Sequence, residues 1–186
     1  MPSNQYYFIA SLPHINYGDK PPMSSAEFRE QCGIFLNSSD FKLLRFCRYD
    51  PQLAIETVKS TGSDFIDLLM QRERILHLTL ASLRAAKLNR PAPAEVPQDV
   101  PRAVAAAKSA FDMDDPLDAA LSIDRARWGV LDEMVGINFF GVNNVFAYLL
   151  KLQLLERKQG FDVKKGFVAH QELHDTILNE YNNSRV

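Results

Sequence analysis

Cysteine is scarce in this chain, and the two that occur, Cys32 and Cys47, follow no disulfide or zinc-binding pattern. We therefore expect two buried free thiols in a reducing compartment. An excess of one charge is also lacking, because 23 acidic residues face 21 basic ones and give a formal net charge of −2. Nucleic acid is not an expected partner, since binding a phosphate backbone requires a basic excess.

Long hydrophobic runs are missing as well, because no stretch approaches the roughly 18 to 20 apolar residues that span a bilayer. The N-terminus, Met-Pro-Ser-Asn-Gln, lacks the basic start of a signal peptide. We expect a cytoplasmic chain. No glycine-rich phosphate loop and no Gly-x-Ser-x-Gly motif occurs, so the residues give no positive indication of an enzyme, and no cofactor is expected.

The most apolar stretch runs from Val142 to Lys158. On a helical wheel, Val142, Phe146 and Leu149 form one stripe, but further apolar side chains fill most of the remaining faces. Neighbouring elements must therefore cover this helix on several sides. We predict a central buried helix.

Hydrophobic periodicity and capping signals predict an all-α fold, arranged as a multi-helix bundle. Ser24 and Glu27 have the spacing of a capping box, which starts a helix. The segment 5–12 is ambiguous between an extended and a short helical form. The expected helices cover residues 25–36, 41–49, 51–59, 65–88, 102–110, 116–135, 142–158 and 162–179.

Four prolines between residues 91 and 101 favour an extended connection. They divide the sequence into an N-terminal helical lobe at 1–90, a proline-rich linker at 91–101 and a C-terminal helical lobe at 102–186. We expect the two lobes to pack as one domain. Chain length allows this, because 186 residues can bury one substantial core.

Several charged residues are expected to face solvent. In the helix predicted at 65–88 these are Arg72, Glu73, Arg74, Arg84 and Lys87. Beyond the linker, Trp128 follows Arg127 and lies close to Arg125. A buried tryptophan flanked by solvated arginines is favoured here over a cation–aromatic surface for a ligand.

Two clusters invite a metal-binding interpretation. His170 and His174 lie four residues apart on one helical face, which is a spacing that can chelate zinc, but no complete ligand set accompanies them. Structural or solvated histidines are therefore favoured. The second cluster lacks the glycine and the closing glutamate of a calcium loop, so helix capping is favoured; its members are Asp112, Asp114, Asp115 and Asp118.

Glu156 and Arg157 end the apolar helix. The favoured interpretation places both in solvent, where Arg157 suits the negative end of the helix dipole. The alternative is a structural latch, in which these charges turn inward and pair, because burying them unpaired would cost several kcal/mol.

Several stretches of the chain also resemble a known family. The run from Phe146 to Arg157, together with Tyr6 to Pro13 and Ser25 to Glu30, resembles a family of small uncharacterised bacterial proteins. The genes of that family lie beside those of V-type ATPase subunits in spirochaetes and Bacteroidetes. Ala126 to Trp128 and Leu131 to Glu133 also carry the resemblance.

This family in turn resembles a shortened form of the V/A-type ATPase C subunit, also called the d subunit. The C subunit is an all-helical socket between the central stalk and the membrane rotor ring. The shared element is the Ala-Tyr-Leu-Leu run at 147–150, whereas Lys158-Gln159-Gly160 departs from the asparagine, leucine and arginine that usually follow.

The resemblance implies a non-catalytic component or accessory of a V/A-type ATPase, or ATP synthase, that serves proton or sodium transport. Its partners would be subunits of the central stalk and the membrane rotor ring. Through them it would lie at the inner face of the cytoplasmic membrane. Two alternatives stay open: a stand-alone metal-dependent enzyme that uses His170 and His174, and a helical self-assembling structural protein.

Overall fold

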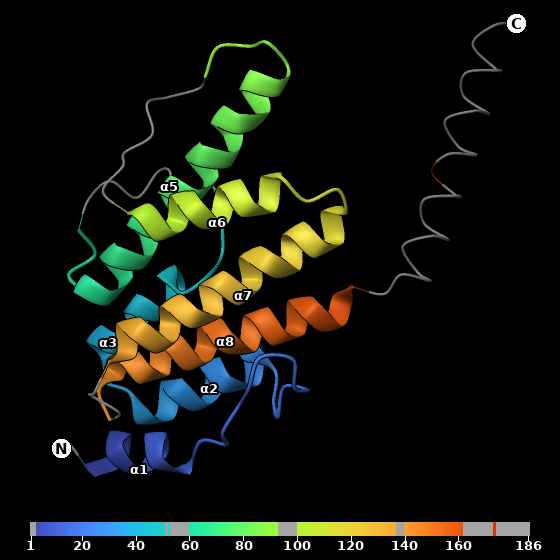
Figure 1. The fold of residues 1–186 in the computed structure, drawn as a ribbon. Helices are drawn as coiled ribbons and strands as arrows, with labels where there is room; N and C mark the ends of the chain where they lie inside the picture. Colours follow the sequence, from blue (N-terminus) through green and yellow to red (C-terminus); the bar gives the residue numbers. More distant parts are fainter. Residues whose placement is uncertain are drawn as a thin grey trace, which may run out of the picture.

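The computed structural model describes residues 3–50, 52, 60–92, 100–136, 140–161 and 173. Within these ranges every regular element is helical, which confirms the all-α class for the described part of the chain (Figure 1). The elements are α1 (Ser3–Ser11), α2 (Ser25–Phe35), α3 (Ser38–Leu43), the 3-10 turn η1 (Leu44–Phe46), α5 (Asp64–Lys87), α6 (Pro101–Phe111), α7 (Pro116–Val135) and α8 (Val142–Gly160).

Several helices begin where local side chains satisfy free backbone amides. The capping box predicted at Ser24 and Glu27 is present at the start of α2. Asn37 caps α3 in the same manner, and Asp115 caps α7 ahead of a proline in the first turn. The ambiguous segment 5–12 is helical and belongs to α1. The helices expected at 51–59 and 162–179 and most of the linker fall outside the described residues.

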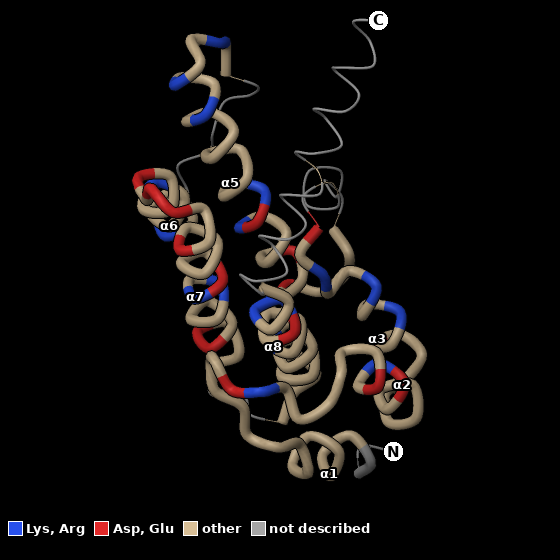
Figure 2. Tube along the Cα trace, turned by 90° about the vertical axis from the view of Figure 1, so that its right-hand side faces the viewer, with Lys and Arg blue, Asp and Glu red and all other residues tan. Residues whose placement is uncertain are grey.

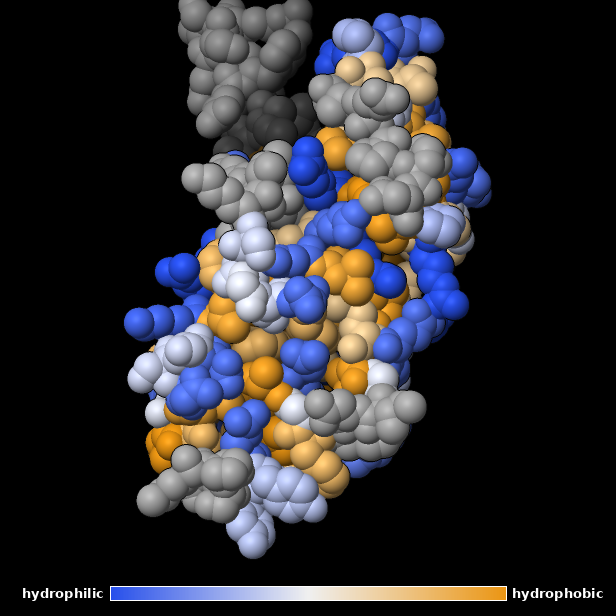
Figure 3. Space-filling model, turned by 90° about the vertical axis from the view of Figure 1, so that its left-hand side faces the viewer, coloured by the Kyte–Doolittle hydropathy of each residue, from blue (hydrophilic) through white to orange (hydrophobic). Residues whose placement is uncertain are grey.

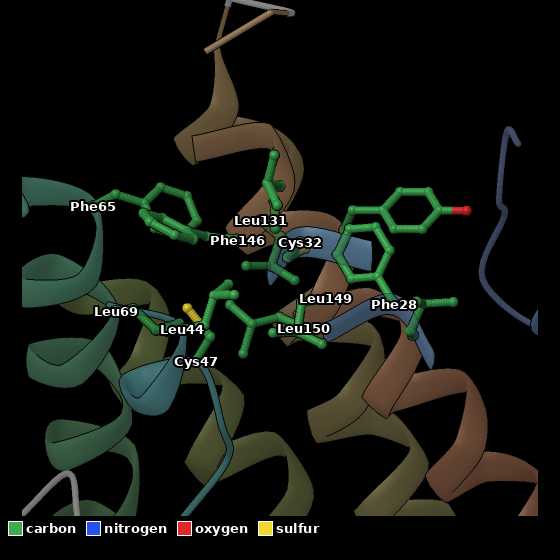
Figure 4. Close-up of a cluster of buried hydrophobic side chains, with 14 of the residues drawn as sticks. Phe28, Cys32, Leu44, Cys47, Phe65, Leu69, Leu131, Phe146, Leu149 and Leu150 are labelled. Atoms are coloured by element: carbon green, nitrogen blue, oxygen red, sulfur yellow. The ribbon is translucent and has the colours of Figure 1, made fainter. Parts of the chain in front are cut away.

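Helix α8 lies at the centre of the bundle, as predicted. Nine of its side chains are buried, on all of its faces, and they run from Val145 to Leu155. Figure 1 shows α7 on one side of α8 and α2 on the other, with α1 beyond α2. Figure 4 shows the side chains that surround Phe146, Leu149 and Leu150, which come from α2, η1, α5 and α7. Both cysteines are free and buried in this core, as expected.

A second, smaller core joins the C-terminal half of α5 to α6. Leu76 and Leu80 of α5 pack there against Val104 of α6. Ala103 and Ala107 lie at this contact, and their small side chains let the two helix backbones approach closely. The larger core, around α8, combines side chains from before and after residues 91–101. The division into two lobes that pack as one domain stays a prediction.

Hydrophobic and hydrophilic residues alternate over the surface, and charge is unevenly distributed among the helices. On the face that Figure 3 shows, hydrophobic residues form small patches separated by hydrophilic ones. Along the tube in Figure 2, the upper end of α5 carries basic residues without acidic ones, whereas acidic residues recur along α7. No helix among the described residues is both long enough and apolar enough to cross a membrane.

Candidate functional site

A cluster of charges, three of them buried, lies where α5, α7 and α8 meet. Glu73, Asp124 and Arg127 are buried and the exposed Arg157 joins them, and we call these four residues the buried charge cluster. The Arg127 guanidinium donates from Nε to Glu73 Oε1 at 2.9 Å and from Nη2 to Glu73 Oε2 at 2.5 Å, and from Nη1 to Asp124 Oδ1 at 3.0 Å. Arg127 is 7% exposed and Asp124 is fully buried. A bidentate arginine–carboxylate pair of this kind fixes both distance and orientation between helices.

The prediction that Glu73 and Arg127 face solvent was wrong. Glu73 is 5% exposed, because it follows Leu69 by four residues and precedes Leu76 by three and so lies on the inward face of α5. Arg127 precedes the buried Leu131 by four residues and so lies on the inward face of α7. Buried neighbours at helical spacing therefore pointed to this cluster, although the charges themselves argued for the surface.

Asp124 completes the cluster, and it too lies on the inward face of α7, four residues before the buried Trp128. Its Oδ2 lies 3.4 Å from Arg157 Nε, which links α7 to the end of α8. The side chain of Arg157 is 44% exposed, and its guanidinium carbon lies 5.7 Å from the centre of the Phe161 ring. Arg157 is thus a solvent-facing residue that reaches one buried carboxylate.

Glu156 reaches a different partner. It is half-buried and accepts hydrogen bonds from the Ser25 backbone N–H at 2.6 Å and from Ser25 Oγ at 2.7 Å. Ser25 is the first residue of α2, so this carboxylate lies at the positive end of that helix. Glu156 and Arg157 therefore connect α8 to α2 and to α7 respectively.

Replacing Glu156 with alanine is expected to lower the free energy of unfolding by about 1–2 kcal/mol, because the first turn of α2 loses an acceptor. Urea denaturation measures this change. Glu30→Ala is the matched control, since Glu30 is an exposed carboxylate on α2, and it should change the value little. In a double-mutant cycle with Ser25→Ala, a coupling energy of zero would exclude the latch.

The charges of Glu73 and Arg127 stabilise each other. Burial alone would raise the pKa of Glu73, but the positive charge and hydrogen bonds of Arg127, with a further contribution from His77, lower it to about 2. Burial would lower the pKa of Arg127, yet Glu73 and the other nearby acidic groups raise it above its ordinary value. Neither group changes protonation near neutral pH, so the pair is suited to holding helices together and unsuited to general acid–base catalysis.

Two further groups border the cluster. The Tyr49 ring lies 4.6 Å from the Arg127 guanidinium carbon, and its hydroxyl oxygen is buried without a hydrogen-bond partner among the described residues. Burial, followed by the negative charge of Glu73, raises the pKa of Tyr49 well above its ordinary value, so it stays neutral. His77 Nε2 lies 3.5 Å from Glu73 Oε2. Two hollows flank Arg127, with volumes of about 210 and 580 Å³.

Trp128 is buried, at 8% exposure, as predicted. The Tyr17 ring contacts it edge-on, with ring centres 5.6 Å apart, and the Tyr17 hydroxyl donates to the Leu121 carbonyl at 3.2 Å. Lys151 Nζ lies 4.9 Å from the Trp128 ring centre. The loop before α2 is thereby fastened to α7, and Trp128 has a structural role.

His170 and His174 lie outside the described residues. Among the residues that the structure describes, no group of three or more histidine, cysteine or acidic side chains is placed to hold a metal ion. Within the aspartate-rich segment, Asp115 caps α7 by accepting from the Leu117 N–H at 2.7 Å.

Comparison with known proteins gives one match. A family model described as "Protein of unknown function (DUF2764)" matches residues 101–181, so the chain is similar to that family over α6, α7, α8 and the sequence that follows. The match covers less than half of the chain. No curated protein and no solved structure matches.

Proposed function

We propose that this protein is a non-catalytic component or accessory of a V/A-type ATPase, similar to the C subunit in linking the central stalk to the membrane rotor. The observation that carries the proposal is the position of the run from Phe146 to Arg157. The Ala-Tyr-Leu-Leu run at 147–150, which resembles the C subunit, lies in the central helix of this fold, and Glu156 and Arg157 of the same helix connect it to α2 and α7.

A linking role of this kind is mechanical. It needs a body that keeps its shape under load, and dense packing together with directional hydrogen bonds supplies stiffness. Arg127 ties α7 to α5, while Glu156 ties α8 to α2. Because the Glu73 pKa is held at about 2, the tie between α7 and α5 does not loosen when the pH around an ion-transporting machine changes near neutrality.

The end of the bundle formed by α1 offers a surface for a partner. Tyr7 is 70% exposed, and Tyr6, which is 48% exposed, contacts Phe140 with ring centres 4.3 Å apart and the rings tilted by 31°. Exposed aromatic side chains of this kind are common where proteins contact one another. Contact there would hold the protein at the inner face of the cytoplasmic membrane through ATPase subunits.

The test is affinity purification of the full chain from native membranes in a mild detergent, followed by mass spectrometry. We expect stalk or rotor subunits of a V/A-type ATPase to copurify. Recovery of the protein without any ATPase subunit would contradict the proposal.

A pair of variants sharpens this test. Tyr7→Ser combined with Phe140→Ser should reduce the copurifying subunits and lower the melting temperature only slightly, because Tyr7 is 70% exposed and Phe140, which contacts Tyr6, is 46% exposed. Met113→Ser alters an exposed apolar side chain on the α6–α7 turn and serves as the control. If all variants recovered equal amounts of ATPase subunits, the surface at α1 would not be the contact site.

Separate measurements test the two alternatives, a metal-dependent enzyme and a self-assembling structural protein. Protein purified without a histidine tag should carry no stoichiometric metal, and finding one metal per chain would instead favour an enzyme built on His170 and His174. Size-exclusion chromatography with light scattering should give a monomer, whereas large assemblies would favour a self-assembling structural protein.

A further inference from the structure

The larger of the two hollows lies between α5, α6, α7 and α8. We call it the Arg84 pocket. Its volume of about 580 Å³ falls within the range of about 300 to 1,000 Å³ that small-molecule sites occupy. Apolar and polar side chains share its lining, and the apolar ones include Leu80 of α5, Phe111 of α6, and Ala120 and Ile123 of α7.

The charged side chains that line the Arg84 pocket are all basic. Arg127 and Arg157 already have the carboxylates of the buried charge cluster as partners. Arg84 has no carboxylate partner among the described residues. The pocket therefore presents one guanidinium whose charge the described structure does not compensate.

The sequence around Arg84 adds further positive charge to this end of α5. From residue 74 to residue 92 the sequence contains no acidic side chain. Lys87 Nζ lies 5.7 Å from the centre of the Phe111 ring, so a second cation is near the rim of the pocket. Figure 2 shows the resulting run of basic residues on the upper part of α5.

The position of Arg84 on α5 indicates how long a bound ligand could be. His77, Leu80 and Arg84 recur at helical spacing on one face, and the seven helical steps from His77 to Arg84 span about 10 Å. An extended chain of about eight carbons has this length. If the carboxylate of a ligand paired with Arg84, the hydrocarbon chain of that ligand would lie against Leu80 and the apolar side chains of α7.

We propose that the Arg84 pocket binds a small amphipathic anion, a carboxylate on an apolar chain of medium length, with its head at Arg84. Carboxylates pair well with guanidinium groups, and the apolar walls gain from covering a hydrocarbon chain. This inference does not depend on the role in an ATPase, since the pocket and its charge belong to the described chain alone.

The test compares octanoate with octan-1-ol, which has the same chain length but no charge. Titration of the full chain, followed by nuclear magnetic resonance at constant ionic strength, should show octanoate binding about tenfold more tightly, the difference that one charge-assisted hydrogen bond provides. The shifted resonances should lie on α5, α6 and α7. Equal affinities for the two compounds would overturn the proposal.

Two variants test whether octanoate binds in the Arg84 pocket. Arg84→Gln should remove the preference for octanoate, whereas Lys42→Gln, which removes an exposed charge from α3, should keep it. Ala120→Phe fills the pocket and should abolish binding of both compounds, with circular dichroism showing that the variant is folded. Unchanged octanoate binding in both Arg84→Gln and Ala120→Phe would show that the anion binds elsewhere and would overturn the assignment.

Discussion

Replacing Arg127 with methionine is expected to lower the free energy of unfolding by about 3–5 kcal/mol, because it leaves a buried carboxylate without its partner. Glu73 is 5% exposed and receives two hydrogen bonds from the guanidinium. Methionine has a similar length and keeps much of the packing, so the loss reports mainly on charge. Urea denaturation at pH 7 measures it.

The matched control is Arg125→Met, two residues earlier on α7. Arg125 is exposed, and its guanidinium carbon lies 5.6 Å from the centre of the Tyr17 ring, so its replacement should cost less than about 1 kcal/mol. A second control, Glu73→Leu combined with Arg127→Met, removes both charges and should recover part of the lost stability. If the two single arginine variants were equally stable, the charge cluster would not contribute to the fold.

The pH dependence gives an independent check of the same effect. In the native protein, the Glu73 pKa of about 2 lies below its ordinary value of 4.5, so its contribution is complete above pH 4.5 and is lost as the pH falls toward 2. Without Arg127, burial raises the pKa of Glu73, and protonation then favours the folded state. The stability gap between the native protein and Arg127→Met should therefore narrow from pH 7 to pH 5, and a constant gap would contradict this explanation.

Much of the fold follows from local rules that the sequence displays. The capping box at Ser24 and the proline after Asp115 place helix starts within one residue of those observed, because the side chains that satisfy the free amides lie next to them in the chain. The central position of α8 follows from its composition, since a helix that is apolar on nearly every face can be stable only when neighbours surround it.

The charge cluster could not be predicted in the same way. Glu73 and Arg127 are 54 residues apart, and Glu156 and Ser25 are 131 residues apart. A charged side chain taken alone is expected at the surface, because burial without a partner is costly. Only the packing of α5 against α7 and of α8 against α2 brings the partners together, so the sequence supplied candidates such as Glu156 and Arg157 but not their contacts.

Replacing Phe146 with alanine is the second change with a large expected effect. Phe146 is fully buried in the N-terminal half of α8, and its ring centre lies 6.1 Å from that of Phe65 on α5. Removing the ring should lower the free energy of unfolding by about 3–5 kcal/mol, through lost apolar burial and the cavity left behind. Phe161→Ala, at the exposed end of the same helix, should cost about 1 kcal/mol or less.

This loss should be the same at pH 7 and pH 5, because no titrating group is involved, and that separates it from the effect of Arg127→Met. The two variants therefore divide the stability of the bundle into a packing contribution around α8 and an electrostatic contribution between α5 and α7. If Phe146→Ala cost no more than Phe161→Ala, α8 would not be the element on which the other helices pack. A rigid link built on the run from Phe146 to Arg157 would then have no physical basis.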